Sequence, residues 1–154
     1  MALFLLFLLG AVDGLRSLTA PALVCWAAHF GWLHFAGSRL AFIDHPGTLV
    51  IFTLLAIVEL VLDKLPNTPS RTAPVGLIAR IVLGAASCIA VAFATGMPAV
   101  LAGVIGAAGA IAGAFGGYNI RHELVVKLRL PDTVVALAED LTAITGGLLI
   151  VSRF

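Results

Sequence analysis

The stretch GAVDGLRSLTAPAL, Gly10–Leu23, places two charged residues inside the first long apolar run of the chain. Asp13 and Arg16 lie three residues apart, so a continuous helix would carry both on one face. An ionisable group at the centre of a bilayer costs at least about 2.5–3.5 kcal/mol, so such groups face a bundle interior, pair or line water. Gly14 and Pro21 weaken a helix here, because glycine is flexible and proline lacks an amide donor. The stretch predicts a first membrane helix broken around a polar centre, with Asp13 and Arg16 facing partners on other helices.

The composition is that of an integral membrane protein. Of the 154 residues, 61% are hydrophobic and 11% are charged, whereas soluble domains carry about 25% charged residues. The net charge of +1 gives no basic surface for nucleic acid. Cys25 and Cys88 lie in apolar segments without metal-ligand spacing and are interpreted as small buried side chains. We find no phosphate loop, zinc motif or nucleophile elbow, so no cofactor, metal site or catalytic residue is predicted.

Five apolar segments are long enough to serve as membrane spans. They are expected at about residues 2–30, 48–65, 74–95, 99–118 and 133–151. The first is too long for one upright helix at 1.5 Å per residue, so it must tilt or break. The sequence therefore predicts an all-α polytopic membrane bundle, formed as one domain with about five transmembrane helices.

The distribution of basic residues predicts an orientation. With five spans, the N-terminus lies on the same side as the connections after the second and fourth spans. That side holds more basic residues than the other, four against two: Lys64, Arg71, Lys127 and Arg129 against Arg39 and Arg153. Because basic residues favour the cytoplasmic side, we expect a multi-pass protein of the inner (plasma) membrane with a cytoplasmic N-terminus.

Every expected span contributes at least one ionisable group within or near the hydrocarbon boundary. These candidate solute- or ion-binding residues are Asp13, Arg16, Glu59, Asp63, Lys64, Arg80, Arg121, Glu139 and Asp140. Glu59 and Asp63 stand at i and i+4, so their carboxylates are expected to point the same way. Because acids and bases nearly balance, we predict a mutually neutralising cluster in the bundle interior. The alternative is a purely structural role, in which buried pairs fix the packing of the helices.

The fourth span, AGVIGAAGAIAGAFGGY, is rich in small residues. Gly109, Gly113 and Gly117 recur at every fourth position. Glycines at this spacing form a groove that lets another backbone approach closely. The groove fits either tight packing inside the bundle or a homodimer interface, and the spacing does not distinguish the two.

A weak internal repeat relates the two halves of the chain. An arginine motif recurs in spans one and four, and a glutamate motif in spans two and five: DGLRS (Asp13–Ser17), GYNIRHE (Gly117–Glu123), LAIVEL (Leu55–Leu60) and VALAED (Val135–Asp140). An odd number of crossings separates the copies, so they would insert with opposite orientation. Inverted repeats with a site at their interface are typical of secondary transporters. Chance matching over so few residues is the alternative.

Three segments together carry a family resemblance: ELVLDKLPNTPSRT (Glu59–Thr72), ARIVLGA (Ala79–Ala85) and PDTVVALAEDL (Pro131–Leu141). They resemble the bacterial membrane family known as domain of unknown function 4126. The Glu-x-x-x-Asp-Lys-x-Pro element is the most specific of these motifs. The chain departs from the family pattern at Gly-Leu-Arg-Ser in the first span and at Pro-Asp before the last. The resemblance implies a multi-pass membrane protein and no particular activity.

The buried charges favour a small transporter or carrier for an anionic or zwitterionic solute. Guanidinium groups bind carboxylate or phosphate in two places, so Arg16, Arg80 and Arg121 are the expected anion contacts. Glu59 and Glu139 are the expected proton or cation partners, which would make transport proton-coupled.

Two other classes of function stay open. In a membrane-embedded enzyme or lipid-binding protein, Asp63, His122 and Glu139 would act near phospholipid headgroups. The absence of a recognisable nucleophile or metal set weighs against an enzyme. In a structural or accessory subunit, the charges would only organise packing. The expected partners are the bilayer and a small solute or lipid headgroup.

Overall fold

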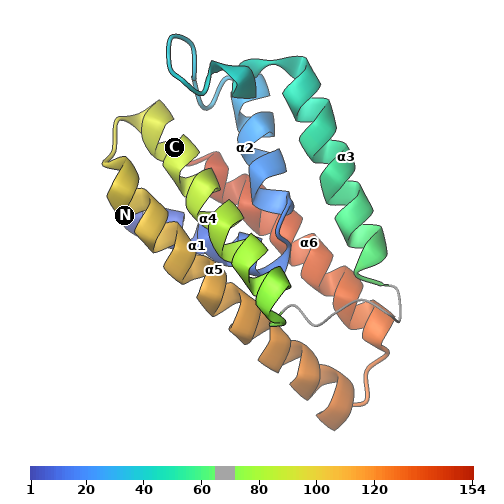
Figure 1. Cartoon of the computed structure of the whole chain (residues 1–154). Coiled ribbons are helices and arrows are strands. Elements are labelled where there is room, and N and C mark those ends of the chain that lie inside the picture. The colour runs from blue at the N-terminus through green and yellow to red at the C-terminus, as the bar shows by residue number, and fades with distance from the viewer. Residues whose placement is uncertain (65–71) are drawn as a thin grey trace.

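The computed structural model describes residues 1–64 and 72–154, and in these residues it contains helices and no strand (Figure 1). The helices are α1 (Ala2–Leu15), α2 (Thr19–His29), α3 (Pro46–Leu62), α4 (Pro74–Thr95), α5 (Ala99–His122) and α6 (Asp132–Val151), with a short 3-10 helix η1 (Ala41–Asp44) and a π-helical turn η2 (Glu123–Lys127). The predicted all-α bundle is confirmed. Residues 65–71, which include the expected end of the second span, Pro66 of the family motif and Arg71 of the basic count, lie outside the described residues.

Within residues 1–64 and 72–154, three helices are long and apolar enough to cross a membrane: Pro74–Thr95, Ala99–Lys127 and Asp132–Val151. α1 and α3 are apolar but shorter, with 14 and 17 residues. Large apolar side chains cover the outside of the bundle, whereas most of the buried polar side chains carry charge. This arrangement, with apolar groups outside and charges inside, suits lipid as the surrounding solvent.

The first expected span, residues 2–30, is two helices rather than one. α1 ends at Leu15 and α2 begins at Thr19. The expected break is therefore present, but it lies between these residues and not at Gly14 or Pro21, which both belong to helices. Arg16 has an extended backbone, with φ −143° and ψ 109°, and this ends α1.

α1 runs from the end of the bundle that holds both chain termini toward the break (Figure 1). Leu6 lies near the start of α1, and its carbonyl accepts a hydrogen bond from Cys88 Sγ at 3.2 Å. Cys88 lies in the second half of α4. A Cβ placed on Gly84, earlier in α4, would lie 3.4 Å from Cβ of Asp13, near the end of α1. Since low numbers in α1 meet high numbers in α4, the two helices run antiparallel.

α2 runs back toward the end at which α1 began. Leu18, just before α2, contacts Glu59 near the end of α3. Trp26, near the end of α2, donates from Nε1 to Thr53 Oγ1 in the first half of α3, at 3.1 Å. α1 and α2 therefore form a bent pair in which the chain reverses its direction inside the bundle, and not one continuous helix.

This reversal corrects the expected topology. The N-terminus lies at the same end of the bundle as the C-terminus (Figure 1). The end of α3, the start of α4 and the end of α5 lie at the opposite end, so the N-terminus does not share a side with the basic connections. α1 also runs parallel to α5, because Gly10 meets Gly106 and Gly14 meets Ala114. The opposite orientation expected of the two repeat copies is therefore absent between these helices.

The glycine face of α5 packs inside the chain. A Cβ on Gly109 would overlap the carbonyl oxygen of Phe7, and one on Gly113 would overlap that of Ala11. On the α4 side, a Cβ on Gly106 would lie only 2.7 Å from Cys88 Sγ. The backbones of α1 and α5 are thus in direct contact, as small residues permit. This is the internal-packing alternative, and a homodimer through α5 stays a prediction.

Candidate functional site

Charged side chains hold the backbone groups at the break between α1 and α2. Arg80 Nε donates to the carbonyl of Gly14, at the end of α1, at 3.1 Å. Glu59 accepts from the amides of Ser17 and Leu18, before α2, at 2.7 and 2.8 Å, and from the Ser17 hydroxyl at 2.5 Å. A helix carries partial negative charge at its C-terminus and partial positive charge at its N-terminus. Each end of the break therefore meets a side chain of the opposite sign.

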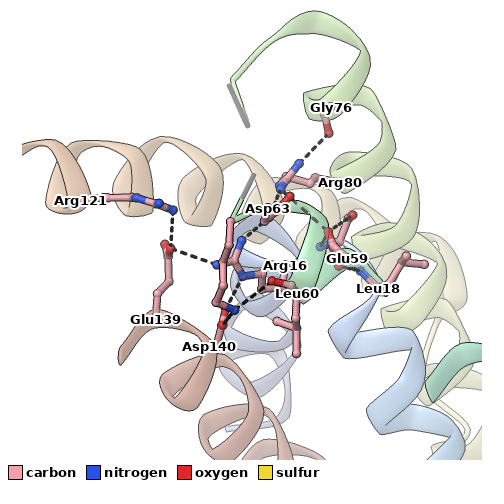
Figure 2. Close-up of polar contacts among 12 residues, drawn as sticks. Arg16, Leu18, Glu59, Leu60, Asp63, Gly76, Arg80, Arg121, Glu139 and Asp140 are labelled. Atoms are coloured by element: carbon pink, nitrogen blue, oxygen red, sulfur yellow. Dashed lines mark hydrogen bonds and ion pairs between the residues drawn. The ribbon is translucent and has the colours of Figure 1, made fainter. Parts of the chain in front are cut away.

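Arg16, inside the break, is surrounded by three carboxylates (Figure 2). Its Nε donates to Asp140 Oδ1 at 2.7 Å, and its Nη1 forms an ion pair with Asp63. Its Nη2 lies 3.7 Å from Glu139 Oε2. The side chain is 1% exposed. A single buried guanidinium thus joins the break to the end of α3 and to α6.

Lys64 and Arg80 complete the contacts on either side of Arg16. Lys64 Nζ donates to Asp140 Oδ2 at 2.6 Å. Arg80 Nη2 lies 3.9 Å from Asp63 Oδ2 and 4.0 Å from Glu59 Oε1. Asp63 and Asp140 each contact two cations, so these ion pairs are linked into one network.

We call the whole group the charge cluster, and it has equal numbers of acids and bases. Its members are Glu59, Asp63, Glu139 and Asp140, with Arg16, Lys64, Arg80 and Arg121. Fully ionised, it is neutral. Arg80 and Asp140 lie inside their helices: at 1.5 Å per residue, Arg80 is about 9 Å from the start of α4 and Asp140 about 12 Å from the start of α6. Arg16, Asp63 and Lys64 lie just after the last residues of α1 and α3.

Glu139 lies between two arginines at the edge of a cavity. Its Oε2 is 3.7 Å from Arg16 Nη2 and 3.7 Å from Arg121 Nη1. The cavity, about 210 Å³, opens among α1, α5 and α6 and is lined by Arg121 and Glu139 together with apolar side chains such as Leu15 and Val135. Within the described residues, Arg16 Nη2 is buried without a hydrogen-bond partner. The cavity therefore combines one carboxylate, two nearby guanidinium groups and an apolar wall.

Asp13 is the one predicted site residue that lies outside the charge cluster. It was expected to share a face with Arg16, but Arg16 follows the last residue of α1 and leaves the helical path there. Asp13 instead faces α4, near Gly84 and Ser87, and is 0% exposed. Glu59 and Asp63 do point the same way, as expected, because both lie within 4.0 Å of Arg80.

Sequence analysis missed several contributors to the site. Ser17 and Leu18 supply backbone amides to Glu59, which no residue pattern reveals before the break is placed. Asp132 binds Arg121 through two hydrogen bonds, of 2.9 and 2.8 Å. Among the described residues, no group of three or more His, Cys, Asp or Glu side chains is arranged to hold a metal ion.

Comparison with models of protein families gives a match over nearly the whole chain. The model of a family described as a domain of unknown function, DUF4126, matches residues 3–152. The chain belongs to the DUF4126 family. The matched region contains the whole charge cluster and the break, so both are features of the family domain as it occurs in this chain. No curated protein and no solved structure matches this DUF4126 chain.

Proposed function

We propose that this DUF4126 protein is a proton-coupled membrane carrier for a small anionic or zwitterionic solute. The observation that carries the proposal is the position of Glu139 between Arg16 and Arg121, at 3.7 Å from a nitrogen of each. These distances exceed that of a hydrogen bond, which is about 2.7–3.2 Å. The guanidinium groups of Arg16 and Arg121 thus both face Glu139 at more than hydrogen-bond distance. A carboxylate or phosphate of a solute could accept full hydrogen bonds from them.

The adjoining cavity suits such a solute. Arg121 and Glu139 present opposite charges on its wall, so Arg121 can bind an anionic group while Glu139 binds an ammonium group. The rest of the lining is mostly apolar, including Leu15, Ile120 and Val135. Small-molecule sites have this form, an apolar wall with a few convergent polar groups that fix orientation. A solute with both charges and an apolar substituent fits best.

The break between α1 and α2 supports a mechanism in which these helices change their arrangement. Transporters use discontinuous helices because the interrupted backbone binds solutes and ions and because it can rearrange. Here Arg16 bonds to Asp63 on α3 and Asp140 on α6, so a solute that draws Arg16 toward the cavity weakens both contacts. Solute binding therefore favours a different arrangement of α1 and α2 relative to those helices, as a carrier needs.

Thermal unfolding of the purified protein in detergent tests the solute site. A panel of carboxylates, amino acids and phosphate esters is compared on the wild type, Glu139→Gln and Arg121→Gln, with Arg39→Gln as an exposed control. A ligand at a hundred times its dissociation constant adds about 2.7 kcal/mol to stability. We expect amino acids or carboxylates to stabilise the wild type and the control but not the site variants.

Reconstituted vesicles then test transport. A solute that stabilises the protein should accumulate in proteoliposomes when a pH gradient is imposed. A solute that binds but does not accumulate would contradict transport, and the absence of any stabilising solute would contradict the site itself.

A second candidate function is lipid binding at Arg121. A second cavity of about 210 Å³ lies on another side of this residue and is lined by Tyr118, His122 and Asp132. Asp132 is 60% exposed, so a lipid phosphate can compete with it for the guanidinium. In that case, anionic phospholipid should stabilise the wild type but not Arg121→Gln, and the solute panel should have no effect.

A further inference from the structure

Asp13 is a buried acid that the charge cluster does not neutralise. It is 0% exposed, on the face of α1 that packs against α4. Neither carboxyl oxygen accepts a hydrogen bond from any residue that the structure describes. The Ser87 hydroxyl lies near it, outside hydrogen-bond geometry, and is itself buried without a partner. Asp13 and Ser87 thus form a small polar site in an apolar interface.

The ionisable groups that face Asp13 are committed to other partners. On α4, Arg80 donates to the Gly14 carbonyl and Cys88 donates to the Leu6 carbonyl. On α3, Glu59 adds a further negative charge and accepts three hydrogen bonds at the break. α5 presents small side chains such as Ala110 to this interface.

A carboxylate in this position would be costly. The penalty for burying an ion is several kcal/mol unless a counter-ion and hydrogen bonds repay it. A neutral carboxylic acid avoids most of that cost, and a buried group changes its protonation state for this reason. The geometry therefore favours the protonated form of Asp13 in the state described.

We propose that Asp13 is the group that binds and releases the coupling proton. This inference rests on the proposed carrier function and assigns the proton to α1, where sequence analysis expected Glu59 or Glu139. Asp13 holds the proton while Arg80 and Glu59 make their hydrogen bonds to the backbone at the break. When the proton leaves, Arg80 is the cation that faces the new carboxylate, and it can reach it only by changing its contacts with Gly14, Glu59 and Asp63. Proton release thus opens the break.

Ser87 gives the proton a route. It lines a cavity of about 270 Å³ among α2, α3 and α4, whose other lining residues include Cys25, Phe52 and Ile43 of η1. In the transfer, the Asp13 O–H bond breaks and its proton passes to the Ser87 oxygen. The Ser87 hydroxyl proton passes in turn to a water molecule that enters this cavity. Asp13 becomes a carboxylate, Ser87 is unchanged, and one hydronium ion leaves.

A proton fits this site better than a metal ion. Hard cations such as calcium take six or more oxygen ligands. Here the nearby polar side chain is a single hydroxyl, and the described residues offer no cluster of metal-binding side chains. A proton needs only the carboxyl group itself.

Infrared difference spectroscopy tests the protonation of Asp13 without a solute. At neutral pH, the wild type should show the carbonyl stretch of a protonated carboxylic acid, and Asp13→Asn should lack it. Asparagine has the size of the neutral acid, so this variant should fold. Ser87→Ala should keep the band but shift its frequency, and Glu59→Gln should leave it in place. A band absent from the wild type, or one that persists in Asp13→Asn, would overturn the proposal.

Flux measurements then separate the proton site from the carrier function. With a solute that binds, Asp13→Asn should still exchange solute across the vesicle membrane but lose accumulation driven by a pH gradient. Unchanged accumulation would overturn the role of Asp13 while leaving the carrier intact. If no solute binds but the infrared band is lost in Asp13→Asn, the carrier function fails and the protonated site stands. Stabilisation by sodium that is lost in Asp13→Asn would replace the proton with a metal ion.

Discussion

Glu59 and Arg80 contact opposite ends of the same helix break and lie 4.0 Å from each other. Glu59 holds the amides of Ser17 and Leu18 before α2, and Arg80 holds the carbonyl of Gly14 at the end of α1. Non-helical backbone is tolerated at membrane depth only where protein or water satisfies its polar groups. This pair of side chains from α3 and α4 therefore allows the chain to reverse inside the bundle.

Removing the Glu59 carboxylate should destabilise the break. Glu59→Ala leaves the amides of Ser17 and Leu18 without their acceptor and removes one ion pair of Arg80, and breaking a buried ion pair costs about 3–5 kcal/mol. Glu59→Gln keeps one acceptor oxygen and should cost about half as much. Chemical unfolding in detergent measures both. Equal stability of the alanine variant and the wild type would show that Glu59 does not hold α2.

Arg16 should be the most sensitive cation of the charge cluster. Arg16→Gln removes an ion pair from each of Asp63, Glu139 and Asp140, so that, among the described residues, each keeps one cation in place of two. We expect this to cost about 3–5 kcal/mol. Arg39→Gln, an exposed arginine outside the cluster, should change stability by no more than about 0.5 kcal/mol. The same unfolding measurement compares the two.

A double-mutant cycle isolates the Arg16–Asp140 contact. If Asp140→Asn is added to Arg16→Gln, part of the loss should be recovered, because one uncompensated acid is removed. Contacting residues of one network show coupling of about 0.5–3 kcal/mol. Strictly additive effects would mean that the 2.7 Å hydrogen bond between them contributes no coupling.

Gly113 and Gly116 lie three residues apart in α5, and substitution by alanine should change stability in opposite directions at the two positions. A Cβ on Gly113 would overlap the carbonyl of Ala11, so Gly113→Ala should cost about 1–3 kcal/mol. A Cβ on Gly116 meets nothing within 4 Å, so Gly116→Ala should be neutral or should stabilise by about 0.5–1 kcal/mol. If both variants were equally stable, α1 and α5 would not pack as closely as described.

The ion pair between Arg121 and the exposed Asp132 should contribute far less to stability than the ion pairs within the charge cluster. Asp132→Asn removes the negative charge and one of the two acceptors that bind Arg121, but Asp132 is 60% exposed. Exposed pairs contribute about 1 kcal/mol or less, so this variant should unfold close to the wild type. Raising the salt concentration should reduce the difference further. A loss as large as that of Arg16→Gln would contradict this ranking.

Cysteine labelling should place both termini on one side of the membrane. The fold puts the chain termini opposite the end of the bundle that carries Lys64 and Lys127, and basic residues favour the cytoplasm. We therefore expect Ala2→Cys and Ser152→Cys to react with an impermeant maleimide outside, and Lys127→Cys only from inside.

The wild type supplies the control for labelling, because Cys25 and Cys88 are both buried and should not react. Labelling of Ala2→Cys and Ser152→Cys from opposite sides would restore the five-span topology. Labelling of both from inside would keep the fold but invert its insertion.

The sequence by itself determined the class of the protein and the polar nature of its interior. Its composition requires lipid around the bundle, and the cost of an unpaired charge in lipid requires the acids and bases to meet inside. The length of the first apolar run, with Gly14 and Pro21 inside it, also indicated that the first helix is interrupted. The conclusions about lipid and about the paired charges follow from residue types, because the free energy of transfer from water to lipid is set by the type of side chain.

Only the tertiary structure decided which charges meet and where the chain reverses its direction. Arg16 bonds to Asp140, 124 residues later, and such a pairing depends on the direction of every helix between them. The spacing of Asp13 and Arg16 predicted a shared face, but that holds only if the helix continues, and it ends at Leu15. Where it ends depends on Glu59 and Arg80, which reach the break from other helices. Backbone groups are satisfied by whatever lies near them in space, and local sequence does not specify that.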